Sequence, residues 1–250
     1  MRARAIALLG AVSYAAFLLA TTPASVVTGR VSAATEGHVQ FTETSGTLWS
    51  GSSRARIMAP GGPVFLDRLQ WRLIPDRLAA GRLAFDVSAA ARGLEARFKA
   101  GRGFSEWELR DVAASADAAF LTAFVPWVSR WRPEGTLAIT TAALTSDERE
   151  TRGAARIEWR NAALALSEVR PLGSYRIEAR GDGGPAKLEV TTLDGPLKVQ
   201  ATGTYSLPAR LSLSGEARGE GESAKALEPL LDLIGPRRPD GARALELRLN

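Results

Sequence analysis

Alternating apolar and polar positions dominate the chain from about residue 39 onward. In one segment, the apolar residues Leu83, Phe85 and Val87 are separated by Ala84 and Asp86. The same period of two recurs at 94–99, 137–141, 157–159, 164–166, 175–177, 188–190, 197–201, 211–213 and 245–249. This period gives each strand one apolar and one polar face, as is typical of antiparallel sheets covered on one side. We therefore predict a mainly β fold, a curled antiparallel sheet resembling a taco or half-barrel.

Glycine residues separate the predicted strands. Four of them begin a Gly-x-Leu step into a new strand: Gly46, Gly81, Gly135 and Gly195. Glycine adopts turn conformations that other residues resist. Because the steps are unevenly spaced, we interpret them as recurring turns and not as an internal repeat.

Two short helices are predicted to cover one end or the open face of the sheet. The first is capped by Ser115–Asp117 and stopped by Pro126, with apolar residues Phe120, Leu121, Phe124 and Val125. The second has Leu227, Leu230, Leu231 and Ile234 at helical spacing, a Ser223 cap and a Gly235 stop. Pro229 is expected either to occupy its first position or to kink it.

The polar segment 143–153 interrupts the strand pattern. It contains several charged residues and ends at Gly153. We expect either a long hairpin tip or a joint between two halves of the domain.

An uncharged, mostly apolar segment follows Arg2 and Arg4, and the next charge is Arg30. A membrane-spanning helix needs roughly 20 such residues, and arginines at its start favour a cytoplasmic N-terminus. We therefore predict a cytoplasmic segment 1–4, a transmembrane signal-anchor at 5–27, a linker at 28–38 and an exported β-rich domain at 39–250.

Two other interpretations of the N-terminal segment remain open. A cleaved signal peptide has the same charge and apolar core, and small residues at Thr22–Ala24 or Val31–Ala33 offer cleavage sites. A buried helix of a soluble domain fits less well, because the segment is apolar on all sides.

The charge of the chain does not indicate a nucleic-acid partner. The net charge is +5, but the arginines are spread along the strands, as at Arg156 and Arg176, and often lie near acids. No compact basic stripe with interleaved aromatic residues is present. We interpret the charges as solvated strand faces, with attraction to anionic phospholipid headgroups as the alternative.

The sequence offers little catalytic chemistry. The chain has no cysteine, and its one histidine is His38, so a His/Cys zinc site and a serine triad with a Gly-x-Ser-x-Gly elbow are not supported. Gly101–Gly103 and Gly181–Gly183 lack the third glycine of a phosphate-binding loop. Two facing carboxylates would still allow a hydrolase. We predict a protein that is not an enzyme, with no catalytic residue, metal site or cofactor.

The six tryptophans are the other conspicuous side chains. We expect Trp49, Trp71 and Trp159 in the core, where aromatic burial contributes most. Trp127 and Trp131 are four residues apart, with prolines and arginines nearby. These two either pack in the core or form a patch for a lipid or protein partner.

A series of short motifs resembles one protein family. The residues are Gly46, Thr47, Leu48, Trp49, Gly51, Trp71, Trp159, Pro171, Leu172, Gly173, Tyr175, Gly195, Pro196 and Leu197. In this order, behind an N-terminal anchor, they resemble protein N of the type II (general) secretion pathway. The resemblance extends over nearly the whole chain, although the linker is short and the middle region is reduced.

The resemblance implies a single-pass inner-membrane protein of a Gram-negative bacterium whose residues 39–250 lie in the periplasm. It implies an accessory, non-catalytic role in moving folded proteins across the outer membrane, with other secretion components as partners. The family also resembles AsmA-like proteins, whose curled sheets enclose an apolar groove. That kinship implies the alternative of a lipid-binding or lipid-transfer module for inner-membrane phospholipid, with a groove at Leu83, Phe85, Leu197 and Val199.

Overall fold

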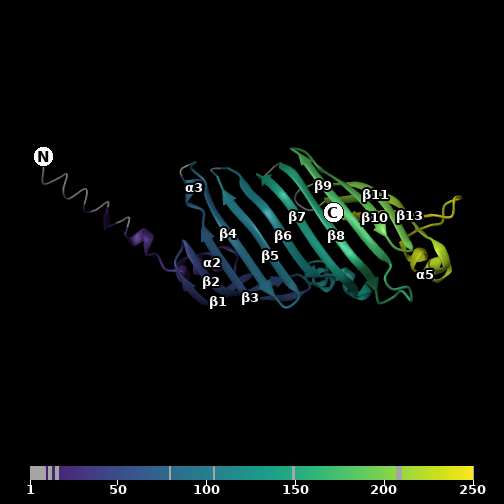
Figure 1. Cartoon of the computed structure of the whole chain (residues 1–250), viewed down its shortest axis with the longest axis horizontal. Helices are drawn as coiled ribbons and strands as arrows, with labels where there is room; N and C mark the ends of the chain where they lie inside the picture. The colour runs from purple at the N-terminus through teal and green to yellow at the C-terminus, as the bar shows by residue number, and fades with distance from the viewer. Residues whose placement is uncertain are drawn as a thin grey trace.

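The chain folds into one open antiparallel sheet (Figure 1). The computed structural model describes residues 10, 13–14, 17–78, 80–103, 105–147, 150–206 and 210–249. Within them, thirteen strands pair only with their sequence neighbours, in the order β1 to β13. The strands are β1 Val39–Gly46, β2 Ser50–Ala59, β3 Gly62–Leu73, β4 Leu83–Ala91, β5 Leu94–Arg102, β6 Trp107–Asp117, β7 Pro133–Ser146, β8 Thr151–Leu164, β9 Gly173–Asp182, β10 Ala186–Asp194, β11 Leu197–Ser206, β12 Arg210–Gly219 and β13 Arg243–Leu249.

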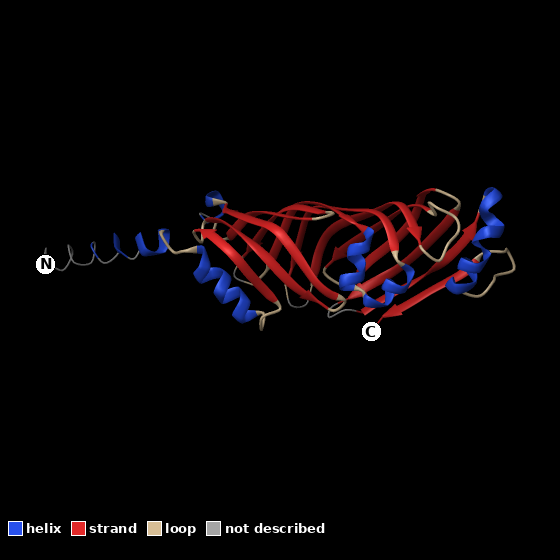
Figure 2. Ribbon diagram, turned by 90° about the horizontal axis from the view of Figure 1, so that it is seen from below, coloured by secondary structure: helices blue, strands red, loops and turns tan. Residues whose placement is uncertain are grey.

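The prediction of a mainly β, antiparallel and open sheet is confirmed. On β3, Val64 and Leu66 are buried, whereas Phe65 between them is 59% exposed. Period-two alternation therefore separates a buried inner face from an exposed outer face. Helical segments lie at both ends of the curled sheet and between them (Figure 2).

The predicted transmembrane helix at 5–27 falls partly outside the described residues. In the part of the chain that the structure does describe, no helix has the length and apolar character needed to cross a membrane. Residues that the sequence analysis divided between anchor and linker form one helix, α2 (Ala24–Ala34). This helix packs against β1 and buries Ala24 and Thr28.

The middle helical segment begins directly after Asp117, the last residue of the predicted cap 115–117. The proposed cap, Ser115, lies inside β6 and pairs with Ala138 of β7, so strand pairing overrides the local capping pattern. Helix starts only after Asp117, as η1 (Ala118–Phe120), α4 (Leu121–Phe124) and η2 (Pro126–Trp131). Pro126 begins η2 instead of ending the helical segment, because proline is favoured at a first helical position, where its missing N–H is not needed.

The predicted C-terminal helix is confirmed as α5 (Ala224–Ile234), preceded by the short turn η3 (Gly221–Ser223). Leu227, Leu230 and Leu231 are its buried residues. Ser223 makes no side-chain capping hydrogen bond. Pro229 lies inside the helix and not at its first position. A separate short helix, α3 (Pro75–Leu78), links β3 to β4.

The buried side chains form two clusters along the inner face. The smaller cluster is centred on Ala55, Val64 and Leu66. The larger one joins β8, β9, β11 and β12 to helix α5, and it contains Ala162, Leu164, Leu172, Tyr175, Leu197, Ala217, Leu227, Leu230 and Leu231. The segment 143–153 holds the end of β7, the connection to β8 and the start of β8.

Candidate functional site

The most distinctive feature of the inner face is an apolar cavity, which we call the apolar trough. Its volume is about 440 Å³, and its lining exposes no polar atom. It is lined by Val39, Phe41, Ala55, Ile57, Val64, Leu66, Leu69, Ala89, Leu94, Phe98, Ala114, Ala116, Phe120, Leu121, Phe124, Leu137 and Ile139. The inward-facing residues of strands β1 to β7 form its floor, and the η1–α4 segment closes one side. A surface of this kind has the chemistry to hold apolar groups.

A smaller apolar pocket of about 230 Å³ adjoins the trough next to helix α2. Phe41 and Leu69 line both cavities. Val27 and Val31 of α2 form one wall, and Phe85 of β4 lies on the floor. Our sequence analysis missed the two valines as lining residues, although their spacing of four already places them on one helix face.

The four residues predicted to line one groove do not lie together. Leu83 and Phe85 are on β4, whereas Leu197 and Val199 are on β11, and the strands β5 to β10 separate the two pairs. Leu197 is only 5% exposed and belongs to the larger buried cluster. Leu83 is 42% exposed. Of the four, only Phe85 lines one of the two apolar cavities described above.

The two tryptophans of the middle helical segment pack edge to face. The ring centroids of Trp127 and Trp131 are 5.5 Å apart, with an interplanar angle of 87°. Trp131 packs partly against the larger buried cluster. Trp127 is 37% exposed, and the nearby Phe124 is 53% exposed. Trp131 therefore anchors the segment, Phe124 contributes apolar surface to the trough, and Trp127 remains partly exposed.

The motif residues 46–51 form the turn between β1 and β2, which holds the N-terminal segment. Trp49 donates its indole N–H to the carbonyl of Leu19 (2.9 Å), and the amide of Leu48 donates to Thr22 (2.9 Å). Trp71 donates its indole N–H to the carbonyl of Leu48 (3.1 Å). Trp49 and Trp71 are half-buried and lie outside both buried clusters.

Glycine is required at one position of this turn. A side chain on Gly51 would meet the ring of Trp71 at 2.5 Å. Its partner across the turn, Gly46, has a positive φ of 91°, which glycine adopts without strain. The short motif is thus explained by close packing of the turn on a tryptophan.

The later motif residues build the larger buried cluster. Leu172 donates its amide to Ala162 (2.7 Å) and accepts the amide of Leu197 (3.0 Å). The ring centroids of Trp159 and Tyr175 are 6.2 Å apart. Trp159 is half-buried and packs against the larger cluster. These residues support the fold around α5, and none of them faces the apolar trough.

Gly173, Gly195 and the neighbouring prolines shape the ends of these strands. The peptide bond between Arg170 and Pro171 is cis. A side chain on Gly195 would collide with the backbone of Gly173. Pro196 joins β10 to β11 and accepts the amide of Glu220 (2.8 Å).

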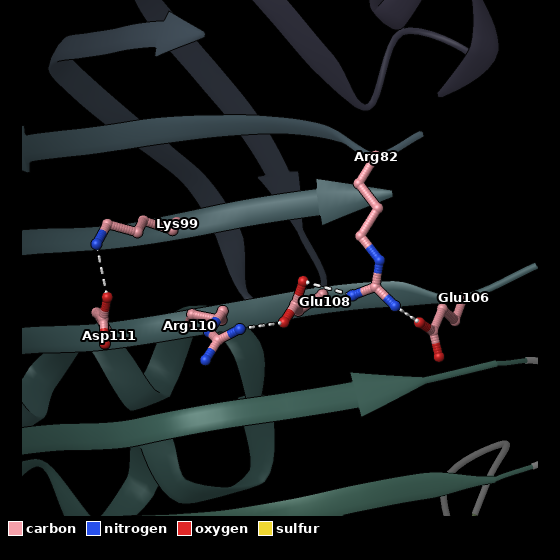
Figure 3. A network of polar contacts seen from close by, with 6 residues as sticks. All are labelled: Arg82, Lys99, Glu106, Glu108, Arg110 and Asp111. Atoms are coloured by element: carbon pink, nitrogen blue, oxygen red, sulfur yellow. Dashed lines mark hydrogen bonds and ion pairs between the residues drawn. The ribbon is translucent and has the colours of Figure 1, made fainter. Parts of the chain in front are cut away.

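A network of ion pairs lies around the start of β4 and β6. Glu108 of β6 accepts hydrogen bonds from Arg82 (3.1 Å) and from Arg110 (3.0 Å) (Figure 3). Arg82 also contacts Glu106 at 2.7 Å. Glu106 and Glu108 each have an arginine partner, which is typical of a structural ion-pair network.

The carboxylates with displaced pKa values are held ionised. Hydrogen bonds from Arg160 and Arg176 lower the pKa of Glu158, and the hydrogen bond from Lys99 lowers that of Asp111 (Figure 3). A hydrolase with paired carboxylates needs one acid with a raised pKa that can donate a proton. Neither of these two carboxylates meets that requirement.

Other catalytic arrangements find little support among the described residues. His38 contacts the carbonyl oxygen of its neighbour Thr35 at 2.8 Å. No group of three or more histidine, cysteine or acidic side chains capable of holding a metal ion occurs in the described part of the chain.

Comparisons with known proteins give one result. A family model described as type II secretion system (T2SS), protein N, matches residues 37–246. That range begins just before β1 and ends inside β13. No curated protein and no solved structure matches the chain.

Proposed function

The chain belongs to the type II secretion system protein N family, and on this premise we propose that it is an accessory, non-catalytic component of the secretion apparatus. Membership of the family implies that the chain is a component of the type II secretion system and that it works with other secretion proteins. The single observation that carries the proposal is the match over residues 37–246, which includes nearly the whole sheet.

The proposed location follows from the N-terminal sequence. Arg2 and Arg4 precede the uncharged segment 5–27, which we propose to be a single membrane anchor with its N-terminus in the cytoplasm. Residues 39–250 then lie in the periplasm. Protease treatment of spheroplasts tests this topology: the β domain is expected to be digested, whereas protection of the whole chain in intact spheroplasts contradicts it.

We propose that the exposed part of the middle helical segment contacts another secretion component. Trp127 is its exposed aromatic residue outside the apolar trough. Exposed aromatic side chains are enriched where proteins bind one another. Trp131 holds the segment in place through its contact with the buried cluster, so the surface is presented by a fixed scaffold.

Deletion and complementation in the native host test the proposal. Loss of the gene is expected to reduce release of folded proteins into the medium, and the intact chain is expected to restore it. A photo-cross-linking residue in place of Trp127 is expected to capture a secretion component. The same residue in place of Arg54, an exposed position on the outer face of β2, is the matched control. Normal release without the gene, together with no captured secretion component, contradicts the proposal.

One observation favours a second candidate, an AsmA-like lipid-binding module. The apolar trough and its adjoining pocket expose no polar atom, and acyl chains of inner-membrane phospholipid have matching chemistry. Native mass spectrometry of the full chain in detergent tests this idea. Phospholipid bound to the intact chain but lost on Ile57→Glu, a change on the trough floor, supports it. A spectrum free of phospholipid contradicts it.

A further inference from the structure

Strand β13 presents an open edge of the sheet. Its only neighbour in the strand order is β12. At its start, Ala244 donates its amide to the carbonyl of Pro236 at 2.9 Å, on the side away from β12. Alternate residues of an antiparallel strand direct their backbone groups to the same side. The N–H and C=O groups of Glu246 and Arg248 therefore point to the open edge as well.

The other edge of the sheet is blunted. Helix α2 packs along β1, and Ser32 of α2 donates its hydroxyl to the carbonyl of Val39 at 2.7 Å. The pairing of β1 is also irregular between Thr42 and Ser45, and Glu43 there has a positive φ of 52°. Bulges and covering helices are the devices that prevent edge pairing. Strand β13 lacks a bulge in its pairing with β12.

Two charged side chains of β13, Glu246 and Arg248, have no ion-pair partner among the described residues, whereas Arg243 at the start of the strand pairs with Glu228 and Asp232. The outer faces of neighbouring strands carry Arg–Glu pairs such as Arg156–Glu178 and Arg218–Glu216. Glu246 and Arg248 instead face Ser214 and Ser212 of β12. Both are exposed, and within the described residues neither takes part in an ion pair. The edge thus carries one acidic and one basic side chain, and each is available for an ion pair with an added strand.

The sequence of this edge is complementary to itself. It reads Leu-Glu-Leu-Arg-Leu from 245 to 249. When two antiparallel copies meet with Leu247 opposite Leu247, Glu246 of one copy lies opposite Arg248 of the other, twice. Leucines occupy the alternate positions in both copies. A shift of this register by one residue places glutamate and arginine opposite leucine and removes both matches.

The backbone geometry fits the same register. Because Glu246 and Arg248 direct their backbone groups outward, each Glu246–Arg248 pair exchanges two N–H···O=C bonds across the edge. Leu247 then forms a non-hydrogen-bonded pair with its copy, in which Cα atoms approach to about 4.5 Å. The segment around Pro236 already covers Ala244, so pairing is limited to the stretch that is self-complementary.

We infer that β13 is a homodimer interface, in which a second copy of this chain extends the sheet across a twofold axis at Leu247. The axis is perpendicular to the sheet, so the apolar inner faces of both copies lie on the same side. The interface is short, and dimer formation is expected to depend on concentration. This inference does not depend on the proposed function, because it uses only the edge and its charges.

Disulfide trapping tests the register. The chain has no cysteine, so single-cysteine variants of the full chain in detergent give clean results. Leu247→Cys is expected to form a disulfide-linked dimer on mild oxidation, because opposite Cβ atoms in such a pair are about 4.5–5.5 Å apart. Leu213→Cys, on β12 directly beside Leu247, is the matched control and is expected to remain monomeric.

Charge reversal tests the pairing independently. Sedimentation is expected to show dimers weakened at least about tenfold for Glu246→Arg and for Arg248→Glu, because each places like charges opposite one another. The double reversal, and an equimolar mixture of the two single variants, are expected to regain dimers. Circular dichroism checks that each variant is folded. No trapping at Leu247 above the control, or no recovery in the mixture, overturns the inference.

Discussion

The hydroxyl of Tyr175 on β9 donates a hydrogen bond to the carbonyl oxygen of Leu197 on β11, at 3.0 Å. These strands are not neighbours, because β10 lies between them. Both residues belong to the larger buried cluster. Burial, reinforced by the carboxylate of Asp194, raises the pKa of the Tyr175 hydroxyl well above its usual value, so it stays protonated and remains a donor.

Replacing this hydroxyl is expected to weaken the fold. Tyr175→Phe keeps the ring but removes the donor to Leu197, and a net loss of about 1 kcal/mol in the free energy of unfolding is expected. Urea denaturation followed by tryptophan fluorescence measures it. Tyr205→Phe, at a tyrosine that is 39% exposed, is the control and is expected to change little. Equal stability of both variants contradicts a structural role for the bond.

The contact between α5 and the sheet predicts a larger effect. Leu227 is fully buried in the larger cluster, whereas Leu233 on the same helix is 67% exposed. Leu227→Ala is expected to cost about 2–5 kcal/mol, because it removes buried methyl groups and leaves a cavity. Leu233→Ala is expected to change the free energy of unfolding by less than about 0.5 kcal/mol. A similar change in the free energy of unfolding in both variants contradicts a specific contribution of the buried Leu227 side chain.

Sequence reasoning succeeds here where structure is decided locally. The alternation at Leu83, Phe85 and Val87 predicts a strand with one apolar face, and the structure has β4 there. The helical spacing of Leu227 and Leu231 predicts α5 in the same way, because each pattern needs only its own period. The ordered motifs likewise predict the secretion protein N family, to which the chain belongs.

Sequence analysis misses features that depend on contacts between distant parts of the chain. The alternation of apolar and polar positions assigns Phe85 and Val199 to apolar strand faces. It does not show how far apart these faces lie in the sheet, where six strands separate β4 from β11. Ser115 has the local chemistry of a helix cap, yet pairing with Ala138 keeps it in β6. Val27, which lines the smaller apolar pocket, lies in the segment 5–27 that the sequence analysis assigns to the anchor. The trough therefore follows from topology and not from local pattern.

Gly195 provides a test of the motif at the start of β11. It has a positive φ of 105°, and a side chain there would collide with Gly173. Gly195→Ala is therefore expected to prevent accumulation of folded protein, because both the backbone conformation and the space are lost. Gly184→Ala, where no atom lies within 4 Å of the added carbon, is expected to fold normally. Immunoblots and thermal unfolding measure the difference.

The Arg160–Glu158–Arg176 cluster on β8 and β9 predicts a dependence of stability on pH. The two arginines lower the pKa of Glu158 in the folded protein. A carboxyl group whose folded pKa is lowered stabilises the fold above its unfolded pKa of about 4.3, and this contribution is lost as pH falls through the folded pKa. Wild type is therefore expected to exceed Glu158→Gln in stability near neutral pH, and the two are expected to converge below about pH 4.

Salt separates this electrostatic effect from a loss of packing at Glu158. In about 1 M NaCl the screening length falls to about 3 Å, and the difference between wild type and Glu158→Gln near neutral pH is expected to shrink, because salt screens the charge of the exposed Arg160 side chain. Arg176→Gln, which removes one of the two donors to Glu158, is expected to show part of the same pH dependence. A wild-type advantage that persists unchanged from about pH 7 to pH 3 contradicts a role for the ionised carboxylate, because only the charged form of Glu158 attracts the two arginines.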